Sequence, residues 1–235
     1  MTLNKALTFT TTAIVVVTFS ATLVLSGCGQ SSTKSSTKGT TAEQLPKVSA
    51  AEAKQAKQKG LDLYRQGDWD GAQAQLQRAV GGNPKDVNAR YQLAYTYEQK
   101  GKLDNAFQQY EEILKVDKGS ADAHYSVGRI LVQKKQLDKA ITEFETAAKL
   151  NPNFTSARAD LAVAYTQKKQ FDKALATYDE LAKLTKTDNF YQSRIHLAKG
   201  KIYKEMGKGS NATAEFNKAL ELDKNNAEAK AALSK

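Results

Sequence analysis

Several residue types are scarce in this chain of 235 residues, which has one cysteine, three prolines, one tryptophan and two histidines. A single cysteine excludes a disulfide bond within the chain, so non-covalent packing must hold the fold together. The histidines, His124 and His196, lie far apart without a cysteine or a carboxylate cluster beside them, unlike the ligands of a zinc site. The chain also lacks a glycine-rich phosphate loop and a Gly-x-Ser-x-Gly motif. We therefore expect no enzyme activity, no metal and no cofactor.

What the chain has instead is a sequence period of 34 residues (94 − 60 for the first pair below). Four series keep this spacing: Gly60, Ala94, Gly128 and Ala162; Ala72, Ala106, Ala140 and Ala174; Leu76, Tyr110, Phe144 and Tyr178; and Asp70, Asp104, Asp138 and Asp172. A fixed period of this length indicates stacked copies of one supersecondary unit. Such arrays offer extended binding surfaces, so we expect a binding function.

One unit, residues 155–188, shows what each copy contains. Leu161 and Tyr165 are spaced as on one helical face, and Tyr178 and Leu181 resume that spacing after a polar break. Asp172 ends the break and is a good N-cap residue, because its carboxylate can accept hydrogen bonds from free backbone N–H groups. The unit is therefore predicted to be a helix–turn–helix pair.

These residues closely resemble the tetratricopeptide repeat family, from about residue 53 to the end of the chain. The resemblance implies an all-α fold, an α-solenoid that forms a right-handed superhelix of about five helix–turn–helix repeats. The predicted domain spans 49–235, with repeats at 53–86, 87–120, 121–154, 155–188 and 193–226 and a short capping helix at 227–235. The chain departs from the family pattern where Lys135 and Lys169 replace a turn glycine and Lys118 and Lys186 replace a closing proline.

Both ends of the array carry helix signals. Ser49 and Glu52 form a capping-box sequence, which places the first helix at about 50–66. Near the other end the register slips, because Ala212 follows Ala174 by 38 residues (212 − 174). The four added residues amount to about one helical turn, so we expect the first helix of the fifth unit to begin early, capped by Asp188.

The first 48 residues differ from the array. Residues 1–27 carry Lys5 as their only charge and an apolar core, which is typical of a signal peptide. The junction before Cys28 resembles the bacterial lipobox, in which the cysteine is lipidated and becomes the new N-terminus. Residues 28–48 are predicted to be a disordered Ser/Thr-rich linker, because they contain too little apolar surface to bury.

Three interpretations of the N-terminal segment compete. The chain is cleaved and lipidated at Cys28, or residues 6–26 stay as a membrane helix, or the protein is secreted and the cysteine is incidental. We favour lipidation, because a short apolar core with a small-residue exit fits a processed signal. The protein is then expected in a bacterial cell envelope, anchored on the extracytoplasmic side of a membrane.

The formal net charge is +10 and lysines crowd the turns. Ordinary solvation of helix surfaces accounts for such lysines, and the alternative is attraction to anionic lipids or wall polymers. Nucleic acid is not an expected partner, because the chain has no basic stripe interleaved with stacking aromatics.

In tetratricopeptide arrays the first helices line the concave face, and the resemblance implies which residues point into that groove. They are Lys57, Leu61, Tyr64, Tyr91, Tyr95, Gln99, Tyr125, Arg129, Val163 and Thr166, followed by Leu197 and Lys201. Tyrosine and arginine often anchor interfaces, although the tyrosines could instead pack between neighbouring first helices. The family's carboxylate clamp is absent, because Leu61 stands where it needs asparagine.

The sequence as a whole predicts a membrane-anchored scaffold. Its groove would hold a peptide or helix of an envelope protein and so assemble a complex there. The alternative is a tether that binds polyanions, either wall polymer or lipid, through its lysine-rich face.

Overall fold

The computed structural model describes residues 45–234. The predicted signal peptide (1–27), the predicted lipidation site Cys28 and most of the predicted linker lie outside the described residues. Over the described range the chain forms eleven α-helices and no strand. The helices are α1 (Ala50–Gln66), α2 (Trp69–Gly82), α3 (Val87–Gln99), α4 (Leu103–Val116), α5 (Ala121–Gln133), α6 (Leu137–Leu150), α7 (Thr155–Gln167), α8 (Phe171–Leu184), α9 (Asn189–Glu205), α10 (Gly209–Leu222) and α11 (Ala227–Leu233).

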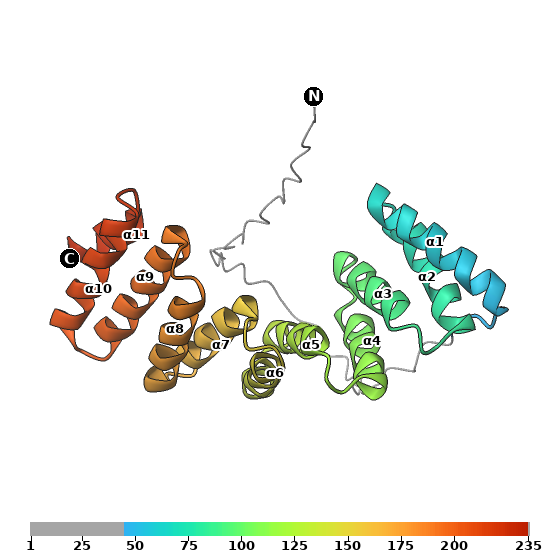
Figure 1. Ribbon diagram of the computed structural model, residues 1–235, viewed down its shortest axis with the longest axis horizontal. Coiled ribbons are helices and arrows are strands. Elements are labelled where there is room, and N and C mark those ends of the chain that lie inside the picture. The colour runs from blue at the N-terminus through green and yellow to red at the C-terminus, as the bar shows by residue number, and fades with distance from the viewer. Residues whose placement is uncertain (1–44, 235) are drawn as a thin grey trace, which may run out of the picture. The chain divides into compact units, whose positions relative to one another are not determined.

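Each odd-numbered helix from α1 to α9 packs against the even-numbered helix that follows it, and the pairs are stacked in sequence order (Figure 1). This is the all-α solenoid that the sequence predicts. Within residues 45–234, none of the helices combines the length and the hydropathy that a membrane span requires.

Small residues let the two helices of a pair approach closely, as helix contacts require. A Cβ atom added at Gly60 would lie 2.8 Å from Leu76 Cγ, and one at Gly128 would lie 2.5 Å from the Phe144 ring. Gly200 stands in the same way against the Phe216 ring, which a Cβ atom would overlap. The glycine-or-alanine position of the repeat therefore faces the bulky position, and the two form the core of each pair.

The turn between the helices of a pair keeps a left-handed residue whether or not it is glycine. Gly67 and Gly101 have φ angles of 78° and 68°, as expected of residues that end a helix. Lys135 and Lys169 adopt φ angles of 59° and 56° at the same position. The lysine substitutions thus preserve the turn but place a Cβ atom where the left-handed conformation disfavours it.

Helix starts follow two of the three predictions. The α1 helix has the Ser49–Glu52 capping box, and α9 begins one turn early at Asn189 with the Asp188 carboxylate accepting from the Tyr191 N–H at 3.0 Å. The N-cap prediction for Asp172 is wrong, because α8 begins at Phe171. Phe171 already belongs to the helix, so Asp172 lies in the first turn. There its negative charge interacts favourably with the helix dipole.

The acids at the same position in α2, α4 and α6 form ion pairs with lysines of the next unit, and we call these pairs the Lys–Asp series. Its members are Lys100–Asp70, Lys134–Asp104 and Lys168–Asp138. Each lysine caps the end of a first helix and reaches back to the preceding second helix. The series stops at the last pair, where the register slip puts Met206 at the lysine position (168 + 38).

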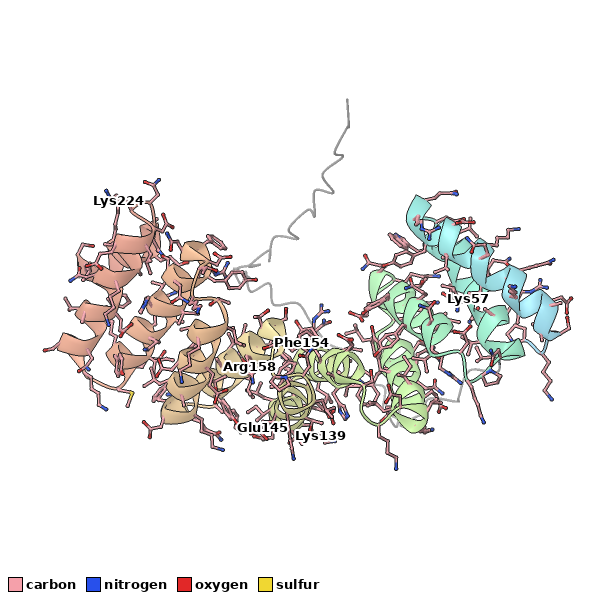
Figure 2. The ribbon with its side chains drawn as sticks, in the orientation of Figure 1. Lys57, Lys139, Glu145, Phe154, Arg158 and Lys224 are labelled. Carbon is pink, nitrogen blue, oxygen red and sulfur yellow. The ribbon has the colours of Figure 1, made fainter. Side chains whose placement is uncertain are left out.

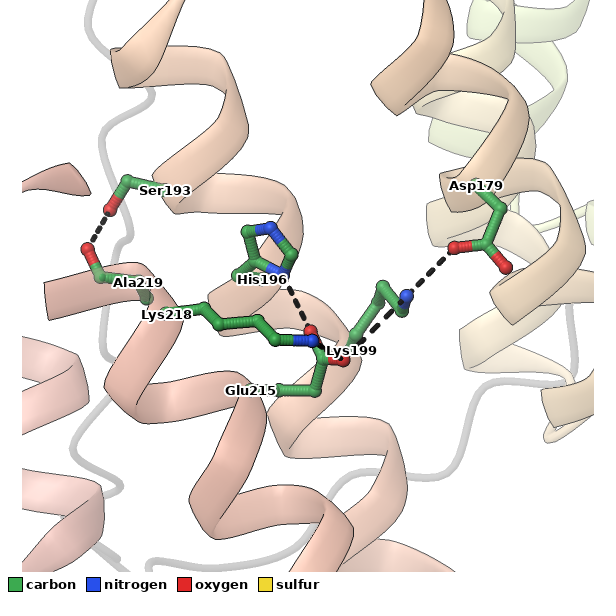
Figure 3. Close-up of polar contacts among 7 residues, drawn as sticks. All are labelled: Asp179, Ser193, His196, Lys199, Glu215, Lys218 and Ala219. Carbon is green, nitrogen blue, oxygen red and sulfur yellow. Dashed lines mark hydrogen bonds and ion pairs between the residues drawn. The ribbon is translucent and has the colours of Figure 1, made fainter. Parts of the chain in front are cut away.

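A polar network replaces the series at this last junction (Figure 3). Lys199 on α9 lies 2.7 Å from Asp179 on α8 and 3.8 Å from Glu215 on α10. Glu215 also lies 2.6 Å from His196 Nδ1 and 3.4 Å from Lys218. Burial raises the pKa of Glu215, but the hydrogen bond with His196 and the charge of Lys199 outweigh it and hold the pKa below its ordinary value.

The buried apolar side chains form two clusters that divide within α9. The larger cluster runs from α1 to Ile195 and Ile202, whereas Leu197 joins Phe216 and Ala229 in the smaller one. One face of α9 therefore shares a separate core with α10 and α11, while its other face belongs to the larger cluster.

We expect Lys135→Gly to stabilise the protein by about 1 kcal/mol, because glycine adopts the left-handed conformation without the cost borne by a residue with a Cβ atom. Urea unfolding measures this as a higher midpoint. The matched control is Lys139→Gly within α6, which should cost about 1 kcal/mol. A lower midpoint for Lys135→Gly would show that the lysine turn carries no strain.

We expect Glu215→Gln to lower the thermal stability near neutral pH and to matter less in acid. A carboxyl group whose pKa is lowered on folding stabilises the fold above its ordinary pKa of 4.5, and loses that effect as the pH falls through the folded value. Melting temperatures measured from neutral pH to pH 3 should converge for the two proteins. Glu221→Gln, on the exposed side of α10, serves as control, and a constant difference across the range would contradict the assignment.

Candidate binding surface on the first helices

Three predicted groove residues contact the N-cap of the next first helix. Lys57 Nζ lies 2.9 Å from Asp86 Oδ2, the Tyr91 hydroxyl lies 2.6 Å from Ser120 Oγ, and the Tyr125 and Phe154 rings are 4.9 Å apart. Figure 2 shows Lys57 on α1 and Phe154 just before α7, away from Lys139 and Glu145 on α6. The side chains of Lys57, Tyr91 and Tyr125 are partly exposed. They join neighbouring first helices and still reach the surface.

Five tyrosines form what we call the tyrosine cluster: Tyr64, Tyr91, Tyr95 and Tyr125 lie on the first helices, and the buried Tyr110 lies on α4. Tyr91 and Tyr95 stack at 6.1 Å, and both meet the Tyr110 ring edge-on at 5.9 and 6.1 Å. Burial raises the pKa of Tyr64, Tyr91 and Tyr95, so these hydroxyls stay protonated near neutral pH. The cluster presents aromatic area together with neutral hydroxyl groups.

Glu98 and Arg129 lie within this cluster. The Tyr110 hydroxyl donates to Glu98 Oε1 at 2.6 Å, and Arg129 Nη1 lies 3.9 Å from Glu98 Oε2. The Arg129 guanidinium is also 5.9 Å from the centre of the Tyr125 ring. The Glu98 side chain is 13% exposed and that of Arg129 is 43% exposed, so the carboxylate is held beneath a more accessible cation.

Asp160 supplies a second carboxylate from α7. Burial raises the pKa of Asp160, and the hydrogen bond from Tyr125 and the charge of Arg129 only partly offset this, so the pKa stays above its ordinary value. Arg129 thus acts on Glu98 of α3 and on Asp160 of α7 from its position on α5. One arginine connects charged groups on three successive first helices.

The remaining candidates do not join this cluster. Lys57 and Leu61 line a hollow of about 830 Å³ beside α1, together with Asp86. Val163 is 44% exposed on α7, whereas the Thr166 hydroxyl donates to the Ala162 carbonyl at 2.8 Å.

Three other predicted groove residues also lie outside the tyrosine cluster. Gln99 is exposed as the last residue of α3. Leu197 is buried in the smaller core, and Lys201 pairs with Glu228 on α11. The structure therefore brings together Tyr64, Tyr91, Tyr95, Tyr125 and Arg129 and leaves the others apart.

Sequence reasoning missed Glu98, Tyr110 and Asp160. Glu98 follows Tyr64 by one period (98 − 64), so the register contained a signal for it, whereas Asp160 matches none of the predicted groove positions. Tyr110 was assigned to the core series only, although its hydroxyl reaches Glu98.

The two histidines face the second helix of their own unit. His124 Nδ1 lies 2.6 Å from Glu143 Oε2, as His196 does from Glu215. Arg90 makes the corresponding contact with Gln109 at 2.8 Å. These are packing contacts within a pair, and no group of three or more metal-ligating side chains occurs in residues 45–234.

Comparison with family models gives matches over most of the array. Models described as tetratricopeptide repeat match residues 57–123 and 108–153, residues 131–202 and residues 193–226. Comparison with curated proteins finds no match.

Solved structures share the fold. One structure of MamA is 24% identical with a TM-score of 0.69, covering 75% of this chain and 94% of its own. Another MamA structure is 25% identical with a TM-score of 0.65, covering 72% and 96%. YrrB, described as a TPR protein with an unusual peptide-binding site, is 20% identical with a TM-score of 0.69, covering 79% and 94%.

We expect Asp160→Asn to raise stability at neutral pH. A carboxyl group whose pKa is raised on folding opposes folding once the pH exceeds its ordinary pKa of 3.8, because the unfolded chain ionises more readily. Asparagine resembles the protonated form, so the gain should vanish below that pH. Unfolding curves at neutral pH and near pH 3 measure the difference, with the exposed Asp172→Asn as control, and a loss of stability at neutral pH would refute the predicted shift.

Proposed function

Because the chain belongs to the tetratricopeptide repeat family, we propose that it is a protein-binding scaffold whose partner lies on the tyrosine cluster and Arg129. The observation that carries this proposal is the junction of half-buried tyrosines with a partly exposed arginine held by Glu98. Tyrosine and arginine anchor interfaces because each combines apolar area with hydrogen-bonding groups. YrrB, which shares the fold, is described as peptide-binding, and this supports a peptide or helix as the ligand.

The protein acts at a bacterial envelope membrane in this proposal. The support is the sequence alone: an apolar segment with a single basic residue, followed by Leu25-Ser26-Gly27-Cys28. A lipid on Cys28 would hold the array at the membrane surface, where the bound partner would join an envelope complex.

The groove assignment is tested by crosslinked pull-down from native membranes. Tyr95→Ala/Arg129→Glu should lose a defined protein that the wild type recovers, because hot-spot side chains contribute about 2 kcal/mol or more each, which is roughly thirtyfold in affinity. Arg78→Glu makes the same charge change on α2, where Arg78 is exposed, and should leave recovery unchanged.

Unchanged recovery with the double variant would contradict the groove assignment. Recovery of an anionic polymer that about 0.5 M salt removes, through a shorter screening length, would favour the alternative of a polyanion-binding tether. The lysine-rich turns are the observation behind that alternative.

The anchor is tested separately by metabolic labelling with a fatty-acid analogue. Cys28→Ala should abolish the label, because Cys28 is the only cysteine in the chain. Label that persists in the variant would refute lipidation at this residue.

A further inference from the structure

Exposed apolar side chains collect at one edge of the array, where second helices end and first helices begin, and we call this the helix-end edge. The last residues of α4, α6 and α8 are Val116, Leu150 and Leu184, which are 50%, 43% and 38% exposed. Phe190 and Tyr191, in the added turn of α9, are 61% and 43% exposed. These five are most of the seven large apolar side chains that are exposed within residues 45–234.

Lysines accompany the apolar residues at the helix-end edge. Each of the three helix-end residues follows a lysine in the sequence, namely Lys115, Lys149 and Lys183, and the turns add Lys118 and Lys186. Among the described residues, Lys118, Lys149, Lys183 and Lys186 have no ion-pair partner within 4.0 Å. Arg194 lies 5.6 Å from the centre of the Phe190 ring.

Three acids in the turns of the helix-end edge accept hydrogen bonds from the backbone, whereas Asp122 and Glu221 are exposed in the adjoining helix turns. The carboxylates of Asp117, Asp188 and Asp223 accept from the N–H groups of Gly119, Tyr191 and Asn225. Glu112, one turn inside α4, pairs with Lys115. Within residues 45–234, the edge therefore presents unpaired lysine cations beside apolar side chains, and the carboxylates in its turns are hydrogen-bonded to the backbone.

The described chain also enters the array at the helix-end edge. Leu45 packs against the core, and a Cβ atom at Gly81 would overlap the Pro46 carbonyl oxygen. Val48 lies against Gly82, the last residue of α2. Sixteen residues separate Cys28 from Leu45 (44 − 28). The disordered linker predicted from the sequence would give this segment a root-mean-square reach of roughly 22 Å.

We propose that the helix-end edge is a contact surface for an anionic lipid bilayer. Aromatic side chains favour the headgroup level of membranes, and lysines beside apolar residues reach anionic headgroups while their stems cover apolar area. The contact is weak by itself, and the inference rests on the proposed anchor at Cys28, which would raise the local concentration of lipid. Contact at the helix ends leaves Tyr95 and Arg129, in the middle of α3 and α5, open to a partner.

The test uses tryptophan fluorescence in the full, lipidated protein on vesicles of brominated phosphatidylcholine with phosphatidylglycerol. The only tryptophan, Trp69, begins α2 at the opposite ends of the helices. We expect the reporter variant Trp69→Phe/Phe190→Trp to be quenched severalfold more than the wild type.

Charge variants separate lipid contact from mere proximity. Lys149→Glu/Lys183→Glu/Lys186→Glu, added to the reporter variant, should lower its quenching to the wild-type level. Lys135→Glu/Lys169→Glu/Lys208→Glu makes an equal charge change at the opposite edge and should leave the quenching of the reporter variant intact.

Co-flotation with the vesicles reports the anchor independently. Protein that floats but shows equal quenching for both tryptophan positions overturns the membrane-facing edge and leaves the anchor standing. Protein that does not float refutes the anchor, and the edge contact with it. If the floated protein self-associates and the quenching of the reporter variant is lost, the edge is an interface between copies. That result also overturns the proposal.

Discussion

Close contact between a small residue on the first helix and a bulky residue on the second is the interaction on which the rest of the structure depends. Gly60, Gly128 and Gly200 leave room that Leu76, Phe144 and Phe216 fill. Because the fit recurs once per unit, every pair closes in the same way and presents the same faces to its neighbours. The spacing of the tyrosine cluster follows from that regularity, since residues one period apart occupy equivalent places on successive first helices.

Contacts between units are of two kinds, exposed ion pairs and partly buried side-chain contacts. The Lys–Asp series lies at the turns that join the two helices of each unit. Its acids are exposed, so each ion pair contributes little to stability in water. Contacts such as Tyr91 with Ser120 lie at the opposite ends of the first helices and are partly buried. The candidate surface is therefore built from residues that also fix the angle between neighbouring units, and substitutions there affect both packing and binding.

The 34-residue period was enough to predict the solenoid and the early start of α9, and the Ser49–Glu52 pair was enough to predict the capping box of α1, because each depends on local spacing. It was not enough for Asp172, because whether Phe171 enters the helix depends on packing around the turn. Nor did it reveal the roles of Glu98 and Asp160. Their environment is set by Arg129 and Tyr125 on other helices, and side-chain contact across units is not visible in local spacing, even where the register places the residues correctly.

The division of the core within α9 has a consequence for how the array opens. In a stack whose units contact only their neighbours, cooperativity passes through each junction in turn. Ile195 and Ile202 of α9, and Met206 at its C-cap, stay with the larger cluster, whereas Phe216 and Ala229 belong to a separate one. The Lys199 network connects α8, α9 and α10. Amide hydrogens of α10 and α11 should then exchange with solvent through a sub-global opening that leaves α1–α8 folded. The C-terminal end would thus act as a separate foldon.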